Sequence, residues 1–229
     1  MKKCILNISS GHWYPIGQRR QSDALDAVGF NGDKLYWTDC YPPGCPSHSQ
    51  LPYGFKPYAF KEARRQGYDY ALWMDSAVWP IKPVDFYFEE IEKEGHVLLQ
   101  NAWTTGNWCK DDALNTLGIT REQALSIPHL MANVMGFNLK HERSMRFLDK
   151  WFNLANDGVT FPGPWSNANG EASSDSRVLG HRHDQTAASV VSYQMGMLWL
   201  STVGSKLLYY DNRPMDQINE EIILLTQGM

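Results

Sequence analysis

Short apolar runs alternate with segments of helical periodicity along most of the chain. Continuous apolar runs predict buried strands, and apolar residues spaced three and four apart predict amphipathic helices. The predicted strands cover residues 4–8, 34–38, 70–74, 96–100, 130–139 and 198–201. The predicted helices cover residues 18–28, 58–66, 84–94, 142–155, 184–194 and 215–225, with a capping box at Thr120 and Gln123 that starts a further short helix. This alternation predicts an α/β fold with a mainly parallel central sheet and helices on both of its faces.

One long segment breaks this alternation. Residues 160–180 are rich in Gly, Ser, Asn and Pro and show little periodicity. Irregular loops of this length in compact domains usually carry function or are disordered. We therefore expect one domain over residues 1–229, with a loop at about 160–180 that acts as a lid.

Composition and charge narrow the classes of function. The chain has 229 residues, 43% of them apolar, and a formal charge of -4 without a basic cluster, which argues against a nucleic-acid partner. None of the four Cys forms a Cys-x-x-Cys pair, so free thiols are expected. The apolar run near the start is too short for a membrane span or a signal peptide. These features predict a cytoplasmic protein without a transmembrane segment.

A carboxylate follows the most apolar predicted strand. Asp75 comes directly after residues 70–74. In open α/β sheets, ligands bind at the carboxyl edge of the strands, so this position suits a binding site. A structural carboxylate in a turn is the alternative interpretation.

The sequence around Asp75 resembles that of GT-A-type glycosyltransferases. The resemblance lies in Lys56-Pro-Tyr-Ala-Phe-Lys61, followed by Gly67-Tyr-Asp-Tyr-Ala-Leu-Trp-Met-Asp75. In that superfamily the strand ends in Asp-x-Asp, and the carboxylates hold Mn²⁺ or Mg²⁺ against the donor diphosphate. Here the motif is degenerate, because Ala77 replaces the second Asp and Ser76 offers only a hydroxyl. Three alternatives follow: a metal held by Asp75 and a residue elsewhere, a metal-independent enzyme, or lost catalysis.

A second stretch, His181-Arg-His-Asp-Gln185, resembles the His-Asp-Glu or His-Asp-Gln segment of retaining GT-A families. The resemblance implies that Asp184 binds hydroxyls of the donor sugar and that His183 lies beside the acceptor or a phosphate. Gln185 stands where some families carry a proposed Glu nucleophile, a role that an amide cannot fill. Asp184 also suits a helix N-cap. The spacing of His181 and His183 permits a metal site, and His181 is a candidate ligand together with Asp75.

The resemblance extends to further donor-binding residues. It implies that the loop after the first strand holds the nucleotide base and ribose, that Lys56 contacts a phosphate, and that Asn133 and Gly136 let the sugar approach the backbone. Gly136 also suits an ordinary buried strand with a bulge. Position after a strand adds two candidates for the cleft. The loop candidates are Ser9, Ser10, Gly11 and Tyr14, and the positional candidates are Asn101 and Trp103.

These features together predict a hexosyltransferase-type enzyme that moves a sugar from a UDP- or GDP-linked donor to a carbohydrate acceptor. The loss of the second Asp keeps an alternative open, a non-catalytic protein that binds nucleotide sugars or carbohydrates on the same fold. A nucleotidyltransferase is disfavoured because Gly11 is followed by His, Trp and Tyr and not by a Gly-rich basic loop. The motifs of common hydrolases and the P-loop are missing from the sequence.

Overall fold

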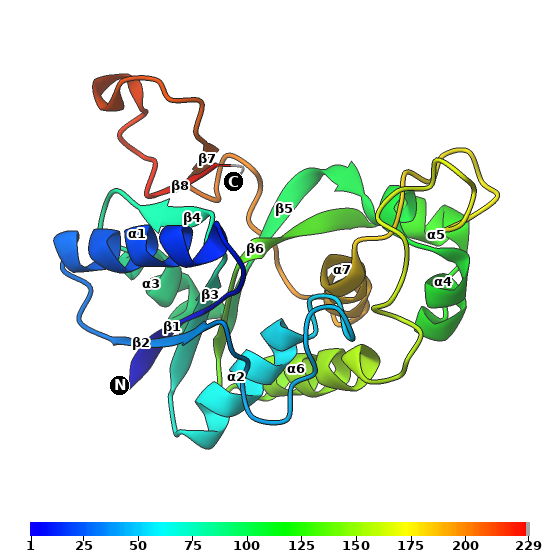
Figure 1. Ribbon diagram of the computed structural model, residues 1–229, viewed down its shortest axis with the longest axis horizontal. Coiled ribbons are helices and arrows are strands. Elements are labelled where there is room, and N and C mark those ends of the chain that lie inside the picture. The colour runs from blue at the N-terminus through cyan, green and yellow to red at the C-terminus, as the bar shows by residue number, and fades with distance from the viewer. Residues whose placement is uncertain (228–229) are drawn as a thin grey trace.

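The computed structural model describes residues 1–227 as a mixed α/β fold (Figure 1). Its strands are β1 (Lys3–Ser9), β2 (Asp33–Thr38), β3 (Tyr70–Met74), β4 (Val78–Pro80), β5 (His96–Thr104), β6 (Pro128–Asn138), β7 (Leu207–Tyr209) and β8 (Leu224–Thr226). Its α-helices are α1 (Tyr14–Ala27), α2 (Phe55–Arg65), α3 (Asp85–Glu94), α4 (Asp111–Leu117), α5 (Arg121–Ser126), α6 (Glu142–Ala155) and α7 (His183–Gln194). Two short 3₁₀ helices, η1 (Thr105–Trp108) and η2 (Met215–Gln217), complete the elements.

The central sheet has five strands in the order β2-β1-β3-β6-β5. Strands β2, β1 and β3 are parallel neighbours, and β6 runs antiparallel to both β3 and β5. Four of the five strands therefore point the same way, which confirms the prediction of a mainly parallel sheet. The carboxyl ends of β1 and β3 lie at the same edge, so the residues that follow them are brought together there.

Helices cover both faces of this sheet (Figure 1). Alternate residues of β3 point to opposite faces: Trp73 packs in the cluster that includes Phe60 of α2 and Phe147 of α6, whereas Leu72 packs in the cluster that includes Ile91 of α3. Helices α2, α6 and α7 thus lie on one face, and α1 and α3 lie on the other. Burial on both faces explains why β3 reads as one continuous apolar run.

The predicted helices agree with the structure along most of the chain. Helix α6 has the predicted bounds, and the predicted capping box is present, because Thr120 accepts from the Gln123 N–H and the Gln123 side chain accepts from the Thr120 N–H. Helix α1 starts four residues earlier than predicted, at Tyr14, with Pro15 in its first turn, where a missing N–H has no cost. No helix within residues 1–227 is long and apolar enough to cross a bilayer.

The last quarter of the chain departs from the prediction. The helix predicted over residues 215–225 is wrong, because only η2 forms there and β8 follows. The strand predicted over residues 198–201 is reduced to one bridge between Leu99 and Leu200. Strand β8 pairs antiparallel with β4 and parallel with β7 in a second, three-stranded sheet. Burial of Leu224 and Leu225 against distant partners overrides the local helical spacing.

Candidate active site

The turn after β3 is held by buried amide side chains. The Gln21 side chain donates to the carbonyls of Asp75 at 2.9 Å and Val78 at 2.8 Å. The Asn7 side chain donates to the Met74 carbonyl at 2.6 Å, and the Ser76 hydroxyl donates to Asn7 Oδ1 at 3.1 Å. Helix α1 and strand β1 therefore fix the backbone that presents Asp75. The Ser76 hydroxyl, predicted to bind the donor, supports this turn.

A buried ammonium joins the two predicted carboxylates. The Nζ atom of Lys56 lies 2.9 Å from Asp184 Oδ2 and 3.4 Å from Asp75 Oδ1, and it donates to the Ala132 carbonyl at 2.8 Å. The side chains of Lys56 and Asp184 are each 3% exposed, whereas that of Asp75 is 34% exposed. The sequence analysis named all three as site residues, and the fold brings them into one cluster.

Burial and charge set the protonation states in this cluster. Burial raises the pKa of Asp184 to about 6, although Lys56 opposes the shift. Burial alone would lower the pKa of Lys56, but Asp184 and Asp75 hold it above its ordinary value. At neutral pH the cluster therefore contains the Lys56 ammonium and the ionised carboxylate of Asp184. A charge buried in this way is stable only with a partner, so the Lys56 ammonium and the Asp184 carboxylate depend on each other.

Two aromatic residues with unusual backbones cover Lys56. Tyr53 has φ 58° and His183 has φ 40°, a region that residues other than glycine seldom adopt. Their rings stack with centroids 5.4 Å apart, and the Trp165 ring meets His183 edge-on at 5.0 Å. The Tyr53 ring centroid lies 5.4 Å from Lys56 Nζ. Backbone strain of this kind gathers at functional sites, where the surrounding packing maintains it.

A cleft with a volume of about 310 Å³ opens beside the cluster. Asp75 lines it together with Ser10 and Tyr14, the predicted residues of the first loop. Four further aromatic rings line the rest of the cleft. Such a mixture of apolar walls and few polar groups is typical of small-molecule sites. The lining residues are Ile8, Ser10, Tyr14, His48, Tyr53, Phe55, Trp73, Asp75, Ser76 and Ala77.

The other two candidates of the first loop, Ser9 and Gly11, flank the cleft residue Ser10 in the sequence. Ser9 is buried, and its hydroxyl has no hydrogen-bond partner within residues 1–227. Gly11 has φ 84°, which favours glycine, and its N–H donates to Asp39 Oδ1 at 3.1 Å. The Gly11 backbone therefore shapes the loop that places Ser10 and Tyr14 at the cleft.

Several buried polar atoms of β6 and α7 have no protein partner among the described residues. They are Asn133 Oδ1 and the Nε2 atoms of His129 and His183. Burial lowers the pKa of His129 to about 3 and that of His183 to about 4, so both imidazoles are neutral. Unsatisfied buried polar atoms are rare in folded proteins and indicate a missing partner such as a ligand hydroxyl or water.

Two further predicted residues meet at one carbonyl. The side-chain amides of Gln185 and Asn101 donate to the Leu130 carbonyl at 3.0 and 3.3 Å. Asn101 also contacts His129 Nδ1 at 3.0 Å and accepts from the Trp103 N–H. The exposed Trp103 ring meets Trp108 edge-on. The strand end that carries Asn101 therefore lies beside His129 and the first turn of α7.

The structure places Gly136 and His181 apart from the cleft. Gly136 lies beneath α3, where an added Cβ would come within 2.4 Å of Ile91 Cδ1, so its role is close packing of helix on sheet. Both ring nitrogens of His181 have backbone partners, since Nε2 lies 2.8 Å from the Thr160 carbonyl and Nδ1 accepts from the Lys110 N–H. Neither nitrogen is left for a metal. Asp184 is also not the N-cap of α7, because Arg182 holds that position.

The residues at the carboxyl edge fit a resident Mn²⁺ or Mg²⁺ poorly. Asp75 Oδ1 already accepts from Trp73 Nε1 at 2.6 Å and faces Lys56, and the ammonium stands between the two carboxylates. Ala77 offers no oxygen from its side chain. Within residues 1–227, no group of three His, Cys, Asp or Glu side chains could hold a metal ion. Hard divalent cations need several oxygen ligands, which this cluster does not provide.

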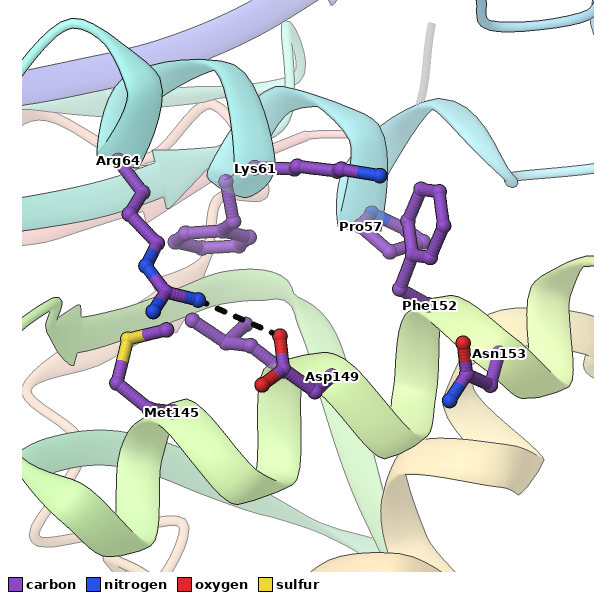
Figure 2. Close-up of a pocket in the computed structure, with 9 residues that line it drawn as sticks. Pro57, Lys61, Arg64, Met145, Asp149, Phe152 and Asn153 are labelled. Carbon is purple, nitrogen blue, oxygen red and sulfur yellow. Dashed lines mark hydrogen bonds and ion pairs between the residues drawn. The ribbon is translucent and has the colours of Figure 1, made fainter.

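A second hollow, of about 270 Å³, lies between α2 and α6 on the helical layer (Figure 2). Figure 2 shows Arg64 of α2 facing Asp149 of α6, with 3.4 Å between Nη1 and Oδ1. The Lys61 ammonium lies 3.9 Å from the centre of the Phe152 ring. No residue predicted to carry chemistry lines this hollow, so it is a groove between packed helices and is separate from the Asp75 cleft.

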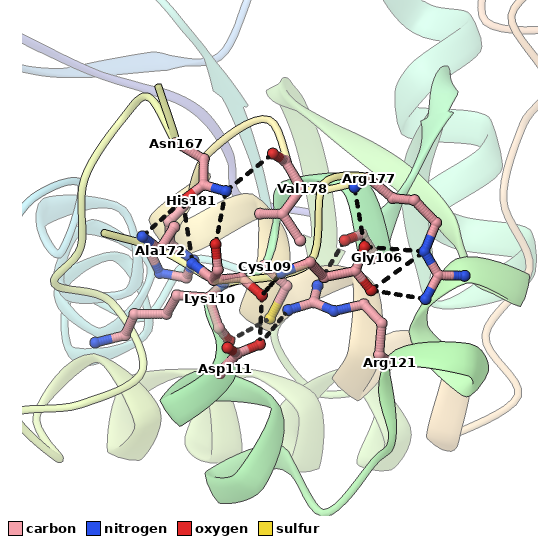
Figure 3. Close-up of polar contacts among 12 residues, drawn as sticks. Gly106, Cys109, Lys110, Asp111, Arg121, Asn167, Ala172, Arg177, Val178 and His181 are labelled. Carbon is pink, nitrogen blue, oxygen red and sulfur yellow. Dashed lines mark hydrogen bonds and ion pairs between the residues drawn. The ribbon is translucent and has the colours of Figure 1, made fainter. Parts of the chain in front are cut away.

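The long loop is folded onto the rest of the molecule by polar contacts (Figure 3). The Asn167 side chain donates to the carbonyls of Ser173 and Val178 and accepts from the N–H groups of Ala172 and Ser173. The Ser173 hydroxyl donates to Asp111 of α4, and Arg177 pairs with Glu122 of α5. The loop therefore has a defined shape that carries Trp165 to His183.

Sequence reasoning missed the aromatic side of the site. Tyr53 and His48 lie in a segment that reads as a Pro- and Gly-rich loop, and nothing local marks either as a site residue. Asn7, Gln18 and Gln21 were also missed. Asn7 is a polar residue in a buried strand, which is the one signal that could have identified it, because buried polar side chains need specific partners.

Comparison with known proteins gives the fold. No protein-family model matches the chain, and no curated protein sequence matches it. Mouse xyloside xylosyltransferase 1 has a similar structure, with a TM-score of 0.50 and 10% identity over 99% of this chain and 97% of that one. A glycosyltransferase involved in glycosylation of the major capsid of PBCV-1 gives a TM-score of 0.49 and 14% identity over 97% and 94%.

A third solved structure shares only part of its length with this chain. The bifunctional glycosyltransferase WbbM gives a TM-score of 0.45 and 11% identity, over 67% of this chain and 34% of its own. The chain thus spans about a third of that protein. The match to the mouse protein runs over nearly the whole of both chains. The chain therefore has the fold of the GT-A-type glycosyltransferases.

Proposed function

We propose that the protein is a glycosyltransferase that moves a sugar from a UDP- or GDP-linked donor to a carbohydrate acceptor. The observation that carries the proposal is the meeting of Asp75 and Asp184 at Lys56, at the carboxyl edge of the sheet beside an aromatic cleft. Carboxylates that accept from hydroxyls and rings that stack on apolar sugar or base faces suit this substrate class. The solved structures of similar fold are named as glycosyltransferases, which supports the same class.

The donor would lie along the cleft from the first loop towards Asp184. Ser10 and Tyr14 line one part of the cleft and would hold the base and ribose. The sugar would lie near Asp184 and the adjacent His183, whose Nε2 atom, like Asn133 Oδ1, is buried without a protein partner within residues 1–227. These atoms can bind sugar hydroxyls that replace the missing hydrogen bonds. Asp75 is partly exposed and would accept from a hydroxyl of the donor.

The chemistry would depend on positioning and electrostatics. Lys56 keeps Asp184 ionised and in place. The Lys56 ammonium is itself buried and stays within the cluster. Gln185 donates to the Leu130 carbonyl, and its amide cannot form a covalent glycosyl intermediate. We infer that the departing nucleoside diphosphate is stabilised by nearby positive charge and that the acceptor is aligned by the aromatic wall.

The test is consumption of a panel of UDP- and GDP-sugars, with and without oligosaccharide acceptors. Wild-type protein should release nucleoside diphosphate from one donor, and an acceptor should speed the release. Asp75→Asn should abolish transfer with a melting temperature near wild type, because the Asp75 side chain is partly exposed. Asp26→Asn, at an exposed ion pair with Lys34, is the matched control and should keep full activity.

The outcomes separate the alternatives. Consumption of a donor supports the proposal. Nucleotide sugar that binds tightly but is never consumed with any cation or acceptor would identify a binding protein on this fold. A large loss of stability in Asp75→Asn would assign that carboxylate a structural role instead.

A further inference from the structure

Arg20 of α1 lies at the edge of the candidate site. Its guanidinium carbon is 3.6 Å from the centre of the Trp79 ring, and its Nη2 atom is 3.5 Å from the Ala77 carbonyl oxygen. Ala77 lines the cleft next to Asp75. Long side chains on helices point back towards the helix N-terminus. The Arg20 side chain accordingly lines a separate hollow with Trp13, Ile16 and Gly17 of the same helix, next to the cleft that contains Ala77.

The charge of Arg20 has no counterion within residues 1–227. None of the ion pairs within residues 1–227 includes this residue. Its Nε atom is buried without a hydrogen-bond partner in the same part of the chain. Burial lowers the pKa of Arg20, but a guanidinium titrates so far above neutral pH that it stays charged. A partly buried cation without a counterion among the described residues indicates a site for an anion.

Arg20 contacts Ala77, the residue at which the Asp-x-Asp motif is degenerate. Ala77 stands where an Asp-x-Asp sequence would place its second carboxylate. Gln21, the neighbour of Arg20, donates to the carbonyls of Asp75 and Val78, so α1 is fixed to this turn. Lys56 is the other cation near Asp75, but Asp184 and the Ala132 carbonyl already occupy its ammonium. Among the described residues, Arg20 is thus the cation at this turn that has no carboxylate partner.

We propose that Arg20 binds the diphosphate of the nucleotide-sugar donor directly, where a carboxylate-bound divalent cation would otherwise lie, so that donor binding needs no resident metal. This inference rests on the proposed function. The guanidinium fork matches two phosphate oxygens, and the Trp79 ring beneath it holds its plane. The same charge would stabilise the nucleoside diphosphate as it leaves.

The first experiment is calorimetric titration of wild type, Arg20→Gln and Arg19→Gln with UDP and GDP, in EDTA and again in Mn²⁺. Wild type should bind one nucleotide with the same affinity in both conditions. Arg20→Gln should weaken that binding about 10- to 100-fold, the usual effect of losing a charge-assisted hydrogen bond. Arg19 is the exposed neighbour, and Arg19→Gln should bind as wild type. Melting temperatures of all three proteins check that the variants are folded.

A double variant tests whether a divalent metal ion can take the place of the Arg20 guanidinium. Arg20→Gln combined with Ala77→Asp restores the second carboxylate and removes the guanidinium. Nucleotide binding by this double variant should be weak in EDTA and recover in Mn²⁺, while Arg20→Gln alone should not recover. If Mn²⁺ does not strengthen nucleotide binding by the double variant, the result would contradict the idea that Mn²⁺ and the Arg20 guanidinium occupy the same position.

The remaining outcomes distinguish this inference from the proposed function. Wild-type binding that appears only with Mn²⁺, or Arg20→Gln that binds as wild type, would overturn the role of Arg20 and leave the glycosyltransferase proposal standing. Wild type that binds neither nucleotide and consumes no donor would overturn both.

Discussion

The rings of Tyr53 and His183 stack with their planes 21° apart, although Tyr53 lies just before α2 and His183 is the first residue of α7. Each holds a positive φ angle, which costs about 1–3 kcal/mol per residue in an L-amino acid. The neighbouring Trp165 ring and the Lys56 ammonium pack against the pair. The strain is therefore retained by the contacts that build the site.

The Tyr53 ring should matter more than its hydroxyl. Tyr53→Ala removes the stack on His183 and opens the cover of Lys56, so we expect transfer to fall about 10-fold or more, as for other well-packed aromatic contacts. Tyr53→Phe keeps the ring and should remain near wild type. Steady-state kinetics of the two variants decide the point. Equal loss in both would show that the hydroxyl, and not the ring, is required.

Removal of Lys56 should destabilise the fold in a pH-dependent way. Lys56→Met leaves Asp184 buried without its cation, a change that costs about 3–5 kcal/mol of unfolding free energy when the carboxylate is charged. At pH 5 the carboxyl group takes up a proton, so the loss should be smaller there than at pH 8. Urea unfolding at both pH values measures the difference. Lys61→Met, an exposed position on the same helix, should change little.

A loss of stability in Lys56→Met that is the same at pH 5 and pH 8 would contradict this explanation. It would mean that the packing of the lysine chain, and not the charge of Asp184, determines the cost.

Transfer should depend on the ionisation of Asp184. Burial raises its pKa to about 6, so kcat/KM should rise with pH through about 6 as the carboxylate forms. The effect on stability has the opposite sign, because an acid with a raised folded pKa takes up protons on folding. Its favourable contribution is present at low pH and is lost as pH rises from about 4 to 6. Asp184→Asn should remove this slope and should impair turnover more than nucleotide binding.

These two measurements check each other. An unfolding free energy that shows the same slope between pH 4 and 6 in wild type and Asp184→Asn would assign the titration to a different group. Equal losses of turnover and nucleotide binding in Asp184→Asn would contradict its contact with the sugar.

The long loop should loosen when its central amide is removed. Asn167→Ala deletes four hydrogen bonds within the loop, so trypsin should cut faster at the exposed Arg177. Transfer should fall as well, because the loop carries Trp165 to His183. Asn153→Ala, on the exposed face of α6, is the control and should be cut at the wild-type rate. Gel analysis of timed digests gives both rates.

The same digests test the predicted lid. Bound nucleotide sugar should slow cutting of wild-type protein at Arg177 if the loop closes over the donor. An unchanged rate at saturating donor would remove the lid from the proposal and leave the loop as a fixed wall of the site.

Local patterns were sufficient where an element is determined by its own residues. The apolar run of β3 and the spacing of α6 predicted both elements, and the order of such segments predicted the sheet. Asp75 was found because it follows a buried strand. Asp184 and Lys56 were found through resemblance to a family, and the sequence does not show that they form one ion cluster, because their contact depends on how α2, β3 and α7 pack.

Other features depend on contacts that no local pattern contains. Residues 215–225 have helical spacing, but Leu224 and Leu225 instead pair with β4 and β7. Tyr53 adopts a left-handed backbone that its side chain disfavours, so its sequence gives no sign of that conformation. The charge of Arg20 looks like an ordinary surface charge until the structure places it beside Ala77.

The pairing of β8 with β4 has a consequence for the order of folding. Strand β4 begins immediately after the Asp75 turn, and the Gln227 N–H donates to the Ala77 carbonyl at 3.2 Å. The turn therefore receives its last support from residues at the other end of the sequence. Contacts between such distant residues form late, because the intervening chain must first be ordered. During synthesis the central sheet can assemble from the nascent chain, while the Asp75 turn is completed only after β8 has left the ribosome.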